Sequence, residues 1–194
     1  MKTALQRIYA SMGEVEKAFN KVRKELEGMG LLFEGWKLDK VDCYHERFSF
    51  GGLYGFGGAM GFFDPDDGDI HIPAFYPPGL LTWWWGERQM LDVLRHEFGH
   101  AVADNYRKFF RGGIFKAAFG ASYGAKKVFD GEDWEGEFVS KYATTATQED
   151  FAEIFMLYMK HKGKLPPHYR GKRAIVKKWK TVGWIIREIS ALRK

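Results

Sequence analysis

The sequence predicts an α+β fold, with short strands in the first half of the chain and helices in the second. Between residues 41 and 75, short apolar or alternating segments are separated by turns rich in Gly, Pro and Asp, which is typical of strands. After residue 87, apolar residues recur every three to four positions over long segments, which is typical of helices. We find no internal repeat and no linker, so we expect a single domain over residues 1–194, α/β to about residue 110 and mainly helical from about residue 111.

The composition indicates a globular chain: 45% of the residues are hydrophobic and 28% are charged. No run approaches the roughly 18 apolar residues of a membrane span, and the N-terminus has no apolar core of a signal peptide. A cytoplasmic monomer is therefore our default expectation, with export by a specialised route or a signal-stripped mature form left open. The single cysteine, Cys43, excludes an internal disulfide and is expected as a partly buried thiol in a strand.

The N-terminal third is predicted to contain one helix and one strand. Apolar residues at helical spacing predict a helix over residues 4–27, which Gly28 and Gly30 would end. Residues 41–50 suit a strand, and the glycine-rich residues 51–61 lack a phosphate-loop lysine, so we interpret them as bulges or turns. The apolar residues assigned to the helix are Leu5, Ile8, Met12, Val15, Phe19, Val22 and Leu26.

A hairpin is predicted next. The segment DPDDGD has the composition of a turn and joins residues 60–63 to residues 70–75. Because Pro73 cannot donate to a strand ladder, we expect the second arm to be an edge strand or to end there. Three tryptophans, Trp83, Trp84 and Trp85, precede the next helix and are expected to pack in the core or at the helix entry; the alternative is that they form the wall of a groove.

The most informative stretch is HEFGH, inside a helix predicted over about residues 87–110. His96 and His100 are four residues apart, so they lie on one helix face, where two imidazoles can bind one zinc ion. Glu97 beside them could accept a proton from a water molecule. Gly99, between the histidines, would let another element approach closely. The alternative interpretation is two histidines on a solvated helix face.

A helix predicted over about residues 148–160 could supply a third ligand. All of residues 151–159 are apolar or aromatic except Glu153, and a lone carboxylate is costly to bury unless it is paired. Glu149 lies one turn earlier on the same face. We interpret one of these acids as a zinc ligand and the other as the brace of a histidine, without deciding which is which. The alternative is two exposed acids on a polar stripe.

Residues 111–147 are expected to form loops and short segments, including a basic, small-residue stretch near residues 111–127 that could be a flexible loop. Thr147 and Asp150 form a plausible capping pair at the start of the helix that follows.

The C-terminal segment is strongly basic. Residues 161–194 contain 11 Lys and Arg against one acid, Glu188, and therefore carry +10, whereas the first 160 residues carry −5. We expect a helix over about residues 173–192 that packs on the rest of the domain and exposes a basic face, including Lys177, Lys178 and Lys180. An anion-binding surface is the alternative; no nucleic-acid motif accompanies it, so nucleic acid is not an expected partner. The apolar face would comprise Ile175, Trp179, Val182, Ile186, Ile189 and Leu192.

The two motifs together resemble a known enzyme family. HEFGHAVAD is followed some fifty residues later by Tyr142, by Glu149 seven positions further on, and by Phe-Ala-Glu ending at Glu153. This arrangement is similar to that of the gluzincin metallopeptidases, in particular the catalytic domain of anthrax lethal factor and the related Pro-Pro endopeptidases. The similarity covers about residues 70–190 and is strong only in the two motifs.

The resemblance implies a zinc-dependent endopeptidase acting on a peptide or protein substrate. It implies a zincin-like fold, with a small twisted mixed sheet, an edge strand beside the HEFGH helix and a helical C-terminal subdomain. An extended substrate would pair with that edge strand, Ile70, His71 and Ile72. The implied zinc ligands are His96, His100 and Glu149, with Glu97 as general base, Tyr142 as the group that stabilises the oxyanion and Glu153 as the residue that orients a ligand histidine.

Two other functions stay open at this point. Regulatory proteases that cleave repressor-type transcription factors also carry HExGH and a downstream glutamate, although the spacing from Tyr142 to Glu149 argues against them. The second alternative is a non-catalytic or latent zincin-like binding module, whose site would be degenerate or covered by a loop.

Overall fold

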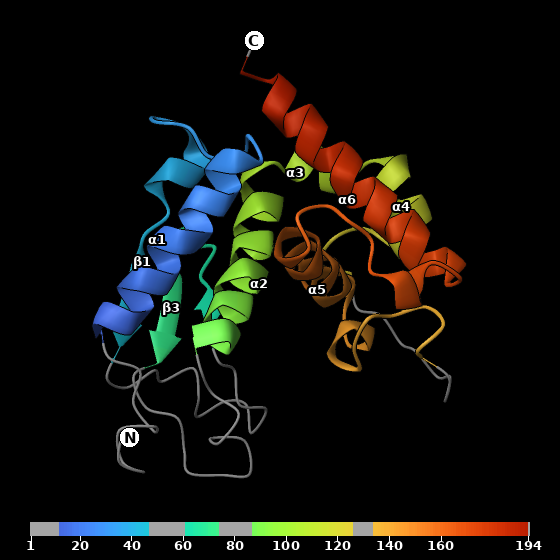
Figure 1. The fold of residues 1–194 in the computed structure, drawn as a ribbon. Helices are drawn as coiled ribbons and strands as arrows, with labels where there is room; N and C mark the ends of the chain where they lie inside the picture. Colours follow the sequence, from blue (N-terminus) through green and yellow to red (C-terminus); the bar gives the residue numbers. More distant parts are fainter. Residues whose placement is uncertain (1–11, 47–60, 74–86, 126–133, 194) are drawn as a thin grey trace, which may run out of the picture.

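The computed structural model describes residues 12–46, 61–73, 87–125 and 134–193. This part of the chain is α+β, as predicted, and is mostly helical with a small mixed sheet at one side (Figure 1). Most of the glycine-rich segment and Trp83, Trp84 and Trp85 lie outside the described residues, so the interpretations given for them stay predictions. Among the described helices, none combines the length and the hydropathy that a membrane span requires.

Helix α1 (Met12–Gly28) lies beside the sheet and packs on the central helix α2. Four residues of its predicted apolar face, Val15, Phe19, Val22 and Leu26, are buried as expected, while Leu5 and Ile8 lie outside the described residues. Met12 was assigned to the same face but is 68% exposed, so that assignment is wrong. The short 3-10 helix η2 (Lys37–Lys40) follows and leads into the first strand.

The sheet consists of β1 (Cys43–Glu46), β2 (Phe62–Phe63) and β3 (Ile70–Pro73), in the order β1-β3-β2. The predicted hairpin is confirmed, since β2 pairs antiparallel with β3, Phe62 opposite His71. Of the two outcomes expected at Pro73, the edge strand is wrong, because β1 pairs with the other side of β3 in parallel, and the end of the strand at Pro73 is confirmed. Pro73 is tolerated because it is the last residue of the strand.

Helix α2 (Glu87–Asn105) is the central element, with α1 and the sheet on one side and α5 on the other (Figure 1). The helix predicted to continue to residue 110 is interrupted at Tyr106, whose backbone angles are φ −124° and ψ 39°. The Asn105 side chain donates to the Ala101 carbonyl at this end. The short helix α3 (Arg107–Phe110) continues in a new direction.

The region expected to be loops contains a further helix, α4 (Gly113–Phe119). The prediction of a flexible loop is therefore wrong for these residues. Phe115 and Phe119 are four residues apart, so they lie on one face, where both are buried against Phe151. These aromatic contacts hold α4 against α5.

Helix α5 (Thr147–Lys160) follows the short helix η5 (Tyr142–Thr144) and has α2 and α6 as its main neighbours. The predicted capping pair is wrong, because the N-cap position is Ala146 and no side chain caps the helix. The Thr147 hydroxyl has no hydrogen-bond partner among the described residues. Asp150 instead contacts Lys178 of the last helix.

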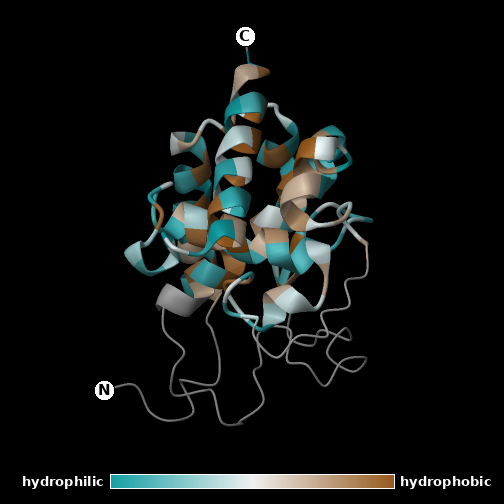
Figure 2. Ribbon diagram, turned by 90° about the vertical axis from the view of Figure 1, so that its right-hand side faces the viewer, coloured by the Kyte–Doolittle hydropathy of each residue, from teal (hydrophilic) through white to brown (hydrophobic). Residues whose placement is uncertain are grey.

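Helix α6 (Arg173–Ala191), which follows the short helix η6 (Pro167–Tyr169), covers α4 and α5. Its predicted apolar face is buried apart from Leu192, which is 45% exposed beyond the helix end. Figure 2 views this side of the molecule and shows hydrophilic residues along the outward face of α6. Lys177 and Lys180 are exposed as predicted, but Lys178 is buried, so the prediction that it lies on the basic face is wrong.

Candidate metal centre

The candidate site lies where α2 and α5 pass each other closely. A Cβ added at Gly99 would lie 3.2 Å from the Cα of Ala152 and 3.3 Å from the Phe155 ring. Such contacts are tighter than side chains normally make, so the two helices approach this closely because residue 99 has no side chain. The expectation that Gly99 admits a neighbouring element is confirmed, and that element is α5.

The close approach brings His96, His100 and Glu149 into one cluster. The Nε2 atoms of the two histidines are 3.2 Å apart. The Glu149 Oε2 atom lies 3.1 Å from Nε2 of His96 and 3.5 Å from Nε2 of His100. His96 and Glu149 are both buried. The alternative of two histidines on a solvated helix face is therefore wrong.

The cluster has the shape and the chemistry of a zinc site. In a tetrahedral site with bonds of about 2.0–2.1 Å, neighbouring ligand atoms are about 3.3–3.4 Å apart. The three distances in this cluster, 3.1, 3.2 and 3.5 Å, bracket that value. Two imidazole nitrogens and one carboxylate oxygen are also a donor set that zinc accepts, with a fourth position left for water or substrate. These three residues could therefore hold a zinc ion.

Each histidine contacts a second side chain through its Nδ1 atom. Nδ1 of His96 lies 2.9 Å from Oε1 of Glu153, and Nδ1 of His100 lies 2.6 Å from the Tyr123 hydroxyl. Glu149, not Glu153, is thus the carboxylate that faces both Nε2 atoms. Sequence reasoning missed Tyr123, because it belongs to no motif and follows α4, a helix that the sequence did not reveal.

Hydrogen bonds between imidazoles and carboxylates in the cluster shift the pKa values of both kinds of group. Burial opposes a proton on His96, but its hydrogen bonds with Glu149 and Glu153 outweigh this and raise its pKa to about 10. Burial also works against the ionised form of Glu149, yet hydrogen bonds with His100 and His96 hold its pKa well below the usual range. A divalent cation bound here would take the place of the proton that Glu149 and Glu153 stabilise on His96.

Glu97 lies in the same cleft as the cluster and contacts the hairpin. It is 6% exposed, and its Oε2 atom accepts a hydrogen bond of 2.9 Å from the backbone N–H of Phe63 in β2. Burial raises the pKa of this carboxyl, while His96 and His100 act in the opposite direction. The side chain is therefore held beside the cluster by one backbone contact.

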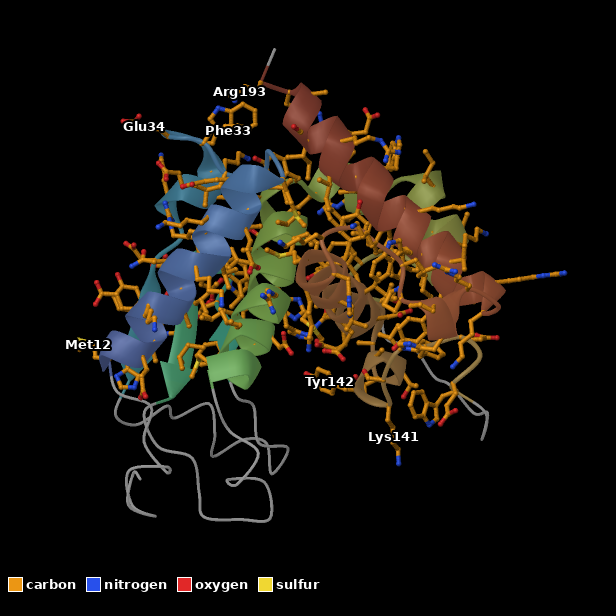
Figure 3. The ribbon with its side chains drawn as sticks, in the orientation of Figure 1. Met12, Phe33, Glu34, Lys141, Tyr142 and Arg193 are labelled. Atoms are coloured by element: carbon orange, nitrogen blue, oxygen red, sulfur yellow. The ribbon has the colours of Figure 1, made fainter. Side chains whose placement is uncertain are left out.

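Tyr142 projects over the cluster from η5. Its ring centroid is 5.8 Å from that of His96, and the side chain is 56% exposed. Figure 3 shows Tyr142 pointing toward α2, whereas the neighbouring Lys141 points away from it. The structure thus brings Tyr142 to the same cleft as His96, His100, Glu97 and Glu149.

This cleft has a volume of about 320 Å³. Of the two hairpin strands, β2 lines this cleft and β3 does not. The predicted substrate residues Ile70 and Ile72 are fully buried in the core, and neither they nor His71 lines the cleft. His71 stacks on Phe62 and contacts the Asp67 carboxylate. Residues that line the cleft include Gly61, Phe62, Phe63, Glu97, Tyr123 and Tyr142.

A comparison with known proteins agrees with this geometry. Residues 86–169 match the model of a family described as "putative zinc-binding metallo-peptidase". The matched segment contains α2, α5 and every residue of the histidine–carboxylate cluster, whereas α1, the sheet and α6 lie outside it. The match supports a zinc metallopeptidase and, with it, a peptide or protein substrate. No curated protein and no solved structure matches the chain.

Proposed function

We propose that the protein is a zinc-dependent endopeptidase of the gluzincin type. The observation that carries this proposal is the cluster of two Nε2 atoms and one carboxylate oxygen, 3.1–3.5 Å apart, on α2 and α5. His96, His100 and Glu149 would hold the ion. The zincin-like fold implied by the HEFGH motif is part of the same proposal, supported by a mixed sheet beside α2.

Bound zinc would supply a Lewis acid that polarises the scissile carbonyl and makes water a better nucleophile near neutral pH. Glu97 accepts the proton of the attacking water and passes it to the leaving amine. Its raised pKa suits this role, because a general base works best with a pKa near the working pH. Tyr142, at the open side of the cleft, donates a hydrogen bond to the oxyanion. Glu153 orients His96 through Nδ1.

The substrate is a peptide that lies along the β2 side of the cleft. Phe62 and Phe63 line that side, and the Phe63 N–H already holds Glu97. Contacts through β3, expected from the sequence, are not part of this proposal, since β3 is paired on both sides.

Metal analysis of the purified protein, followed by digestion of a peptide library read by mass spectrometry, tests the proposal. We expect one zinc per chain and cleavage that a chelator abolishes. Glu97→Gln should retain stoichiometric zinc and lose roughly 10²–10⁴-fold in turnover. Glu16→Gln, an exposed position on α1, is the matched control and should behave as wild type. Absence of zinc, or full turnover by Glu97→Gln, would contradict the mechanism.

A further inference from the structure

The last helix places a charged side chain inside the molecule. Lys178 of α6 is 3% exposed, and its ion-pair partner Asp150 is fully buried. The Lys178 Nζ atom lies 2.7 Å from Oδ2 and 3.0 Å from Oδ1 of Asp150. Taking two charges out of water is costly, and their attraction repays it only when further hydrogen bonds complete the geometry. Moving either segment away would leave a buried charge without its partner, which is strongly destabilising.

A third contact of Lys178 extends the pair to another segment. Nζ donates to the backbone carbonyl of Glu137 at 2.7 Å and lies 4.1 Å from the centre of the Phe138 ring. One ammonium group thus connects α6 to the start of α5 and to the stretch that leads into η5.

Both segments carry residues of the candidate site. Asp150 directly follows Glu149 in the first turn of α5, a helix end that no side chain caps. The stretch after Glu137 contains Ser140, whose side chain hydrogen-bonds Glu153, and then reaches Tyr142. A helix turns by about 100° per residue. A rotation of the first turn of α5 that released Asp150 would therefore also move the Glu149 carboxylate.

We propose that Lys178 is a positioning residue for the metal centre. It holds the first turn of α5 and the 137–142 stretch in register, so that Glu149 and Tyr142 reach the cleft from two different elements. The inference rests on the proposed function for the identity of the metal. It also implies that the centre depends on α6, which lies outside the segment that matches the family model.

The main test compares zinc affinity between Lys178→Met and two control variants. For folded Lys178→Met we expect the zinc dissociation constant, measured by competition with a chromophoric chelator, to rise roughly 10–100-fold. Lys180→Met changes an exposed lysine of the same helix and should bind zinc as wild type does. Ile189→Ala removes core volume from the far end of α6 and should lower thermal stability without changing zinc affinity.

Replacing zinc by Co²⁺ provides a second measurement, one that a loss of stability alone does not change. The visible absorption of bound Co²⁺ reports the arrangement of its ligands, so Lys178→Met should alter the spectrum while Ile189→Ala leaves it unchanged. Wild-type zinc affinity together with a wild-type cobalt spectrum in folded Lys178→Met would overturn the proposal.

A double variant covers the case in which Lys178→Met does not fold. Replacing both partners of a buried ion pair by apolar residues is often neutral for stability, so Lys178→Met/Asp150→Leu should fold. We expect its zinc affinity to stay lowered, because the link to Glu137 is lost; a return to wild-type affinity would overturn the proposal. Failure of the proposed function is distinguishable, since it would appear as absent zinc or absent peptide cleavage in the wild-type protein.

Discussion

At the scale of single residues, the two histidines of the cluster each use both ring nitrogens. Nε2 of His96 and of His100 faces Glu149, while their Nδ1 atoms contact Glu153 and Tyr123. A contact at Nδ1 fixes the plane of an imidazole ring and its tautomer. One ring is braced by a carboxylate and the other by a phenol, so the two braces differ in charge and can be tested separately.

We expect Tyr123→Phe to weaken zinc binding roughly tenfold. The change removes only the hydroxyl that contacts His100, and the phenyl ring can keep its packing against Phe110 and Phe151. Chelator competition measures the affinity, and circular dichroism checks the fold. Tyr44→Phe, on the exposed face of β1, serves as control. Equal zinc affinity in the two variants would show that Tyr123 does not support His100.

At the scale of elements, the site depends on how closely α2 and α5 pack. Helix α2 is covered on several sides, since Val93 and Ala103 are buried in addition to Leu94 and Phe98. Gly99 sets the separation from α5, because an added Cβ would meet the backbone of Ala152 at 3.2 Å. Ligands on two helices keep their spacing only while that separation is kept.

Gly99→Val should therefore affect stability and metal binding together. Overfilling a packed contact costs about 1–3 kcal/mol of unfolding free energy, and the displacement of α5 would move Glu149 away from the histidines. Urea unfolding of the metal-free protein measures the first effect, and chelator competition measures the second. Gly13→Val is the control, because a Cβ at Gly13 in α1 meets nothing within 4 Å. Unchanged zinc affinity in Gly99→Val would mean that the helix separation does not control the site.

At the scale of the whole molecule, one hydrophobic core contains residues from α1, β3, α2, α4, α5 and α6. Helices α1, α2, α5 and α6 could be predicted from their periodicity, and His96 and His100 from their spacing, because these patterns are local in sequence. Glu149 was distinguished from Glu153 only by the family resemblance. The central place of β3 in the sheet could not be predicted, since it depends on pairing with β1. In that pairing Ile70 lies opposite Cys43, which is 27 residues earlier in the sequence.

Two further features were hidden for the same reason. Lys178 lies three positions after Ile175 and four before Val182, on the apolar side of α6, but the partner that allows its burial, Asp150, is 28 positions away in the sequence. The contact of Tyr123 with His100 depends on α4, which is held by aromatic packing against Phe151. Local patterns thus revealed the two motifs, Glu153 included, whereas the roles of Tyr123 and Lys178 come from tertiary contacts.

Because the proposed ligands join α2 to α5 across this core, zinc should stabilise the whole fold. A ligand at a free concentration 100 times its dissociation constant adds about 2.7 kcal/mol to the free energy of unfolding. For a chain of this size, that corresponds to a rise of roughly 5–10 °C in the melting temperature. Calorimetry of the chelator-treated protein, before and after zinc is restored, measures the shift. His96→Ala lacks one ligand and should show little or none of it; an equal shift in both proteins would place the stabilising ion elsewhere.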